Sequence, residues 1–215
     1  MKGLLLKDIY MTLKYCKAYF IISVIFLALI FVDDASSLTT LNFMFVVFPC
    51  ILAGVIPVNL IAYDEKSRWI QYSATLPYTR SQLVNVKYFI GILLQLFMLV
   101  LSAIVLVIRM AVLGALEIGT VAFVLIVIFA VSLLSSSVSM PFIFKFGVEK
   151  GRVAYYFAIG VSSGISIFTT EFLWAGVSLS SLAVSVISLA MLLGCIALYT
   201  LSWFLSIIFY KKREL

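Results

Sequence analysis

The chain has 215 residues, of which 65% are hydrophobic and only 11% are charged, whereas soluble domains have about 45–50% apolar and about 25% charged residues. This composition excludes an ordinary soluble protein and indicates an integral membrane protein. The absence of histidine excludes HExxH zinc sites, Ser–His dyads and most imidazole proton relays. The three cysteines lack metal-binding spacing and are expected to pack as small apolar residues.

Residues 2–17 predict an amphipathic helix at the start of the chain. The helix has a charged face, with Lys7, Asp8 and Lys14, and an apolar face formed by Leu5, Leu6, Ile9 and Leu13. Such a helix lies along the cytoplasmic leaflet, held by apolar burial and by attraction to anionic lipid. The alternative is a basic flank of the first span with no role of its own. A signal peptide over residues 1–37 fits less well, because two aspartates crowd the supposed cleavage site.

Long runs without a charged residue predict the membrane spans, because a helix needs about 17–25 residues to cross the hydrocarbon. The runs cover residues 18–32, 41–63, 88–108, 119–144, 153–170 and 172–210. The last run is too long for one span, so we expect an external loop or re-entrant piece at 174–181 and a final helix over 182–210. Polar residues within the spans are neutral, so we expect no buried ionisable group and no ion-coupled transport.

The basic residues predict the orientation of these spans, since lysine and arginine in short loops stay on the cytoplasmic side. Of the 15 basic residues, only Arg109 lies on the opposite side, where the loops carry aspartate and glutamate instead. Such sorting requires an even number of crossings. The sequence therefore predicts an all-α integral membrane protein, one domain over residues 1–215, with six transmembrane helices and both termini in the cytoplasm.

Residues 64–87 form the longest polar segment of the chain. A short helix around Trp69 is expected to end at Pro77, because proline lacks a backbone donor and restricts the preceding residue. Thr79 and Gln82 then have the spacing of a capping box at the start of the next helix. Helix, break and capped restart make an elbow suited to a cytoplasmic partner; the alternative is a solvated loop without one.

Residues 141–152 form the second predicted cytoplasmic loop. Pro141 is expected to bend or end the fourth helix, and the glycines of this segment allow a tight turn. The motif GxxxxGK[ST] is absent from the chain, so the sequence has no recognisable nucleotide site.

Gly160 and Gly164 form a GxxxG motif in the fifth predicted span. Small residues at this spacing let two helix backbones approach closely. The motif is open to two interpretations, packing within the bundle or contact between two subunits.

Three strings carry a family resemblance through their order and their placement relative to the spans: KGLLLKDIY, YDEKSRWIQYSATLPYTRSQLVNVKYF and MPFIFKFGVEKGR. In these strings the chain resembles the permease subunits of type-2 ABC exporters, over essentially its whole length. More narrowly, it is similar to the small permeases of the phenol-soluble modulin exporters of Gram-positive bacteria, which move amphipathic peptide toxins.

The resemblance implies a half-transporter in the bacterial plasma membrane, which pairs with a second copy or a homologue. Each copy would bind a separate ABC ATPase that holds ATP and Mg²⁺, so this chain itself would have no catalytic, cofactor or metal site. Lipid and a peptide substrate are further implied partners, and nucleic acid is not. ATPase coupling would fall to the elbow, at Asp64, Glu65, Lys66, Arg68, Trp69, Tyr72, Pro77 and Arg80. The first, second and fifth helices would line the substrate path, with Phe20, Phe26, Phe45, Phe48 and Asn59 as candidates.

Other functions stay open from the sequence. Among exporters, the cargo could instead be a bacteriocin or antimicrobial peptide, or a lipid. An immunity permease or a non-transporting sensor or immunity protein would have the same composition. An aspartyl intramembrane protease is disfavoured, because Tyr63-Asp64 has no partner GxGD motif.

Overall fold

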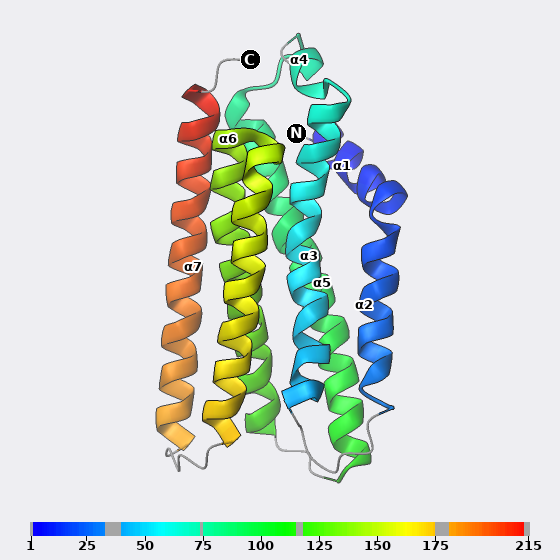
Figure 1. Ribbon diagram of the computed structural model, residues 1–215, viewed down its shortest axis with the longest axis vertical. Coiled ribbons are helices and arrows are strands. Elements are labelled where there is room, and N and C mark those ends of the chain that lie inside the picture. Colours follow the sequence, from blue (N-terminus) through cyan, green and yellow to red (C-terminus); the bar gives the residue numbers. More distant parts are fainter. Residues whose placement is uncertain (1, 33–39, 74, 115–117, 175–180, 213–215) are drawn as a thin grey trace.

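The computed structural model describes residues 2–32, 40–73, 75–114, 118–174 and 181–212. Over these residues the chain is helical and contains no strand, which confirms the predicted all-α class. The long helices run side by side in one bundle (Figure 1). The elements are α1 (Lys2–Tyr15), α2 (Lys17–Leu29), α3 (Thr40–Lys66), α4 (Trp69–Ser73), α5 (Arg80–Val112), α6 (Ile118–Trp174) and α7 (Ser181–Lys212).

Four helical stretches in the described residues are long and apolar enough to cross a membrane: Phe43–Lys66, Arg80–Val112, Gly119–Glu149 and Ser188–Lys212. The pair of α1 and α2, bent by 63° between them, makes a fifth if it counts as one span. The chain is therefore a multi-pass membrane protein. The number of six crossings and their direction through the bilayer stay predictions.

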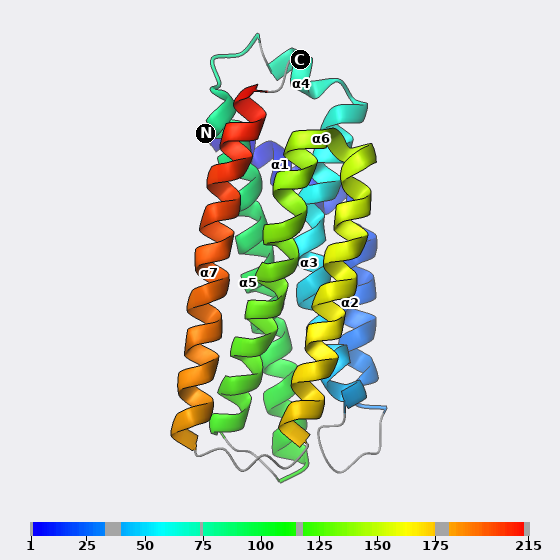
Figure 2. The ribbon, with the colours of Figure 1, turned by 60° about the vertical axis from the view of Figure 1, so that its left-hand side comes forward.

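Helix α6 reverses direction at a single residue. Gly147 has φ 80° and ψ 173°, a conformation that glycine adopts without the steric cost of a Cβ atom. The two halves of α6 lie side by side and run in opposite directions (Figures 1 and 2). The segment 141–152, expected to be a loop, is thus helical on both sides of Gly147.

Pro141 lies inside α6 and does not end it, so of the two expected outcomes, a bend or an end of the helix, the end is wrong. Proline removes one backbone donor from the helix but already has a helical φ. Helices in membranes tolerate such a residue because neighbouring helices and hydroxyl side chains satisfy the freed groups. Pro49 and Pro57 likewise lie inside α3.

The core lies between α3, α5 and the first half of α6, where Ile56, Met98 and Ile128 are fully buried. A polar contact crosses this core: Gln95 Nε2 donates to Ser132 O at 3.0 Å and to Ser136 Oγ at 2.5 Å. Gly54 makes room for the contact, because a Cβ atom there would lie 2.6 Å from both Gln95 Nε2 and Ser136 Oγ.

One end of the bundle gathers α4, the start of α5, the reversal of α6 and the end of α7 (Figures 1 and 2). The N-terminal half of α1 lies at the same end, so the first and last described helices begin and finish there. Lys66, Arg80, Lys211 and Lys212 lie there too, whereas Arg109 is in the last turn of α5 at the other end. We call the end that carries Lys66, Arg80, Lys211 and Lys212 the basic end.

Candidate functional site

Helix α1 turns part of its charged face, at Asp8, into the protein. Leu4, Asp8 and Thr12 are buried, whereas the predicted apolar face is largely exposed, at Leu6, Ile9 and Leu13. The residue pattern predicts the two faces of α1, and the structure shows that Asp8 packs against the bundle. Charges pack inward here because they find opposite charges on α3 and α5, and the apolar face is left for lipid.

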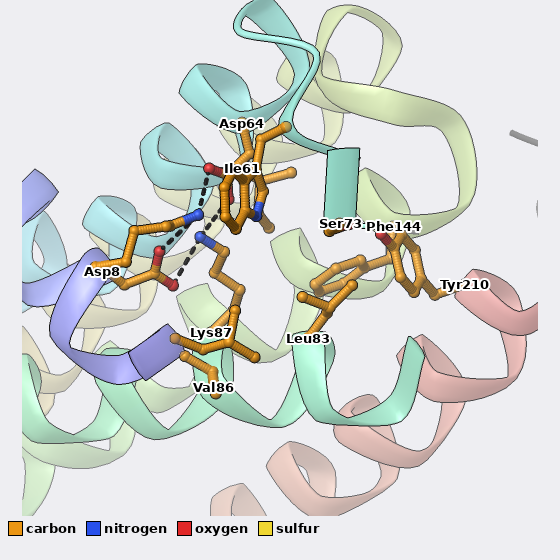
Figure 3. A pocket seen from close by; sticks show the side chains of 12 residues that line it. Asp8, Ile61, Asp64, Ser73, Leu83, Val86, Lys87, Phe144 and Tyr210 are labelled. Atoms are coloured by element: carbon orange, nitrogen blue, oxygen red, sulfur yellow. Dashed lines mark hydrogen bonds and ion pairs between the residues drawn. The ribbon is translucent and has the colours of Figure 1, made fainter. Parts of the chain in front are cut away.

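Four charged side chains from three helices form a compact cluster at the basic end, Lys7, Asp8, Asp64 and Lys87, which we call the charge quartet (Figure 3). Lys87 Nζ lies 2.8 Å from Asp8 Oδ2 and 2.6 Å from Asp64 Oδ2. Lys7 Nζ lies 2.7 Å from Asp64 Oδ1 and 3.2 Å from Asp8 Oδ1. Each lysine thus bridges both carboxylates, and the formal charges cancel.

The charge quartet corrects the expectation that the chain buries no ionisable group. Asp8, Asp64 and Lys87 are buried, and only Lys7 is partly exposed. Buried charges are costly unless paired, and removal of one partner leaves the other uncompensated. Ionisable residues within membrane-spanning helices usually mark a functional site, so the quartet defines the site to build on.

The short helix α4 sits directly on the quartet. Lys7 Nζ lies 4.2 Å from the centre of the Trp69 ring, within the range of a cation–π contact. The Trp69 ring also lies 5.4 Å from the Tyr72 ring of the same helix, tilted by 48° to it. The turn from α3 into α4 places Arg68 at φ 55°, a left-handed conformation that is uncommon outside glycine.

A cavity of about 30 Å³ beside the quartet is lined by residues from nearly every helix of the bundle. Its lining comes from α1, α3, α4, α5, α6 and α7, and Figure 3 shows Phe144 and Tyr210 across from Asp64 and Lys87. Of the helices in the described residues, only α2 contributes nothing to this lining. A displacement of α4 at this cavity would therefore change contacts with most of the other helices.

The predicted coupling residues divide into those that make contacts within the protein and those that are exposed. Asp64 belongs to the quartet and is not available to a partner. Glu65 Oε2 accepts the backbone N–H of Val148 at 3.1 Å, just after the reversal of α6. Arg80 Nη1 donates to the Lys211 carbonyl at 3.2 Å, so it ties α5 to the end of α7. The exposed group consists of Lys66, Arg68, Tyr72 and Pro77.

The capping box at the start of α5 is confirmed. Gln82 N donates to Thr79 Oγ1 at 3.3 Å, and Thr79 N donates to Gln82 Oε1 at 3.1 Å. Helix α4 ends at Ser73, before Pro77. The segment between α3 and α5 is therefore an elbow with a defined restart, as the residue pattern indicates.

The candidate path residues lie where α2 faces α3. Phe26 stacks at 5.3 Å on Phe48 and lies 6.2 Å from Phe45. Asn59 Nδ2 donates to Tyr19 Oη at 3.0 Å; the sequence interpretation did not single out Tyr19. Phe20 is partly buried and packs against the core. These residues make an aromatic seam between two helices with one polar contact at the end nearer the quartet.

Gly160 and Gly164 lie on an open face of the second half of α6. A Cβ atom on either glycine would meet nothing within 4 Å. Among the described residues nothing packs against these two positions, so the structure gives no support to packing within the bundle. Contact with a second subunit stays a prediction.

Comparison with protein families identifies the family of the chain. Residues 3–211 match the family model described as ABC-2 family transporter protein. No curated protein and no solved structure matches the chain. Because the match covers nearly the whole chain, which is a multi-helix membrane protein, the chain belongs to the ABC-2 family of transporters and is a membrane-spanning permease component of that family.

Proposed function

We propose that this chain is the permease subunit of an ATP-driven exporter whose energy comes from a separate ABC ATPase docked on the elbow between α3 and α5. The observation that carries the proposal is the contact of α4 with the charge quartet, through Lys7 and Trp69. It connects an exposed surface, suited to a soluble partner, with buried groups that join three helices.

The exposed surface has the chemistry of a docking site. Tyr72 is 58% exposed on α4, and the basic residues Lys66 and Arg68, which precede α4 in the chain, are exposed as well. Aromatic and arginine side chains are the groups that most often anchor protein interfaces. The backbone that carries Lys66, Arg68 and Tyr72 is held to the bundle by the Trp69–Lys7 contact and by the hydrogen bond from Val148 to Glu65. A partner would therefore bind side chains on a segment that is anchored to the helices.

A displacement of the elbow would be transmitted to the substrate path through α1. The quartet links Lys7 and Asp8 to α3 and α5, and α1 continues through a 63° bend into α2. Helix α2 carries Phe26 of the aromatic seam. Closure of two ATPases would thus press the elbow, displace α1 and separate α2 from α3, as alternating access requires.

The proposed cargo is an amphipathic or hydrophobic peptide, of which phenol-soluble modulin-like toxins are an example. The seam of Phe26, Phe45 and Phe48 is apolar and aromatic, and such a surface accepts an apolar helix face without stripping water from ions. Antimicrobial peptides share this chemistry, so a peptide panel decides between them. In the functional assembly two copies of the chain, or one copy and a homologue, would enclose the path.

Reconstitution with an ABC ATPase that copurifies with the chain tests the proposal. Tyr72→Ala should weaken ATPase binding and lower peptide transport at least tenfold, while the matched variant Phe204→Ala, an aromatic residue 60% exposed on α7, should keep both. Equal ATPase binding by the two variants would remove the elbow as the docking site. A chain that binds ATPase but moves no member of a peptide panel would instead be a sensor or immunity subunit.

A further inference from the structure

A groove on the outside of the bundle lies where α5, α7 and the start of α1 meet. Its volume is about 460 Å³, within the range of about 300–1,000 Å³ that small ligands occupy. The groove is separate from the charge quartet and from the aromatic seam. Its residues are Leu5, Asn85, Val86, Tyr88, Phe89, Ile92, Tyr199, Thr200 and Trp203.

The polar atoms of the groove are largely paired within the protein. Trp203 Nε1 donates to Asn85 Oδ1 at 2.8 Å, and Tyr199 Oη donates to the Tyr88 carbonyl at 3.1 Å. The Tyr88 hydroxyl lies 2.8 Å from Ser202 Oγ and 2.6 Å from Ser206 Oγ. With these groups satisfied, the walls offer hydrocarbon, chiefly Phe89, Ile92 and Leu5.

The groove also has a basic mouth. Lys211 follows Thr200 of the groove by eleven residues, about three turns, and so lies on the same face of α7, about 17 Å further along the helix axis. Lys2 precedes Leu5 by one turn on the same face of α1. Both lysines are exposed at the basic end. The separation of these lysines from the groove along their helices suits a molecule with an apolar tail in the groove and an anionic head at its mouth.

We infer that the groove binds an anionic phospholipid of the adjacent leaflet, with an acyl chain against Phe89 and Ile92 and the phosphate at Lys2 and Lys211. The charge of the mouth favours this occupant over a second copy of the chain, because two identical basic mouths would repel each other. Trp203, with its ring in the groove and its N–H paired to Asn85, has the placement that tryptophan adopts near the membrane surface. The inference needs only a membrane-embedded chain and does not depend on the cargo or on the ATPase.

Fluorescence of Trp203 tests the inference directly. With Trp69→Phe and Trp174→Phe, Trp203 is the sole tryptophan, and brominated lipids quench it on contact. In phosphatidylcholine vesicles, brominated phosphatidylglycerol should quench Trp203 at several-fold lower mole fraction than brominated phosphatidylcholine does. Lys2→Gln or Lys211→Gln should each reduce this preference about fivefold, and the matched surface variant Lys66→Gln should not change it.

A second pair of variants tests the groove itself. Thr200→Phe fills it and should reduce quenching by both lipids, whereas Leu96→Phe, on an exposed face of α5 outside the groove, should not. Equal quenching by the two lipids would overturn the inference. So would the absence of quenching by either lipid, which would show that a second copy covers the groove, or protection of Trp203 by an amphipathic peptide but not by phosphatidylglycerol.

Discussion

Lys87 Nζ of α5 lies 2.8 Å from Asp8 Oδ2 of α1, in a site where both side chains are buried. Asp8→Asn would leave the two lysines facing one carboxylate, and loss of a buried ionic partner costs about 3–5 kcal/mol. We expect the free energy of unfolding, measured in micelles, to fall by about this amount. We also expect proteases to cleave α1 faster.

The matched control is Lys14→Gln, an exposed charge on the same helix, which should change stability by less than about 0.5 kcal/mol. The conservative variant Asp8→Glu should retain more of the stability, because it keeps a carboxylate that faces both Lys7 and Lys87. Equal stability of Asp8→Asn and Lys14→Gln would contradict the assigned role of the quartet.

Trp69→Ala should uncouple ATP hydrolysis from transport. It removes the ring over Lys7 and so loosens α4 from α1, while the exposed docking residues stay in place. In vesicles containing the ATPase, the transport rate per ATP hydrolysed should fall several-fold although the ATPase still binds. Trp69→Phe keeps an aromatic face and should retain more of the ratio; identical ratios for the alanine and phenylalanine variants would argue against force transfer through this contact.

Gly54→Ala should destabilise the core. Its Cβ atom would lie 2.6 Å from Gln95 Nε2 and from Ser136 Oγ, so both groups must move from a buried hydrogen bond. Overpacking of this kind costs about 1–3 kcal/mol. Gly194→Ala, where an added Cβ meets open space, is the control and should be neutral or stabilising by up to about 1 kcal/mol, as thermal unfolding in detergent would show.

Gly151→Ala should disturb the pair of helices on either side of Gly147. The new Cβ would lie 2.6 Å from Ile143 Cγ1 and 3.0 Å from its Cα, and a backbone atom cannot turn aside as a side chain can. We expect a clear drop in the melting temperature, compared with Gly160→Ala on the open face of the same half-helix. A Gly151→Ala protein as stable as Gly160→Ala would mean that the two halves of α6 lie further apart.

Much of the fold follows from local patterns. Uncharged runs predict the long helices because the bilayer sets their length, and Thr79 with Gln82 predicts the start of α5 because a capping box needs only neighbouring residues. The sequence allowed Pro141 to end its helix because proline removes a backbone donor, whereas neighbouring helices in a bundle can satisfy the freed carbonyl.

The site was harder to predict, because it joins residues far apart in the sequence. Lys7, Asp8, Asp64 and Lys87 become neighbours only through packing of α1 against α3 and α5. The amphipathic pattern of α1 predicts two faces but not which face packs against the protein, because an apolar face beside lipid and a charged face toward partners satisfies the same pattern. The adjacency of Lys7 to Asp8, opposite an aspartate at the end of the second run, was the available signal.

The reversal at Gly147 has a mechanical consequence. Each half of α6 extends from it over more than 25 residues, about 40 Å of helix. A tilt of about 5° at the glycine would displace the distant tip by about 3 Å, by the geometry of a rod of that length. Because Glu65 holds the first amide after the glycine, small movements at the end of α3 would be amplified along this lever arm toward the opposite membrane face.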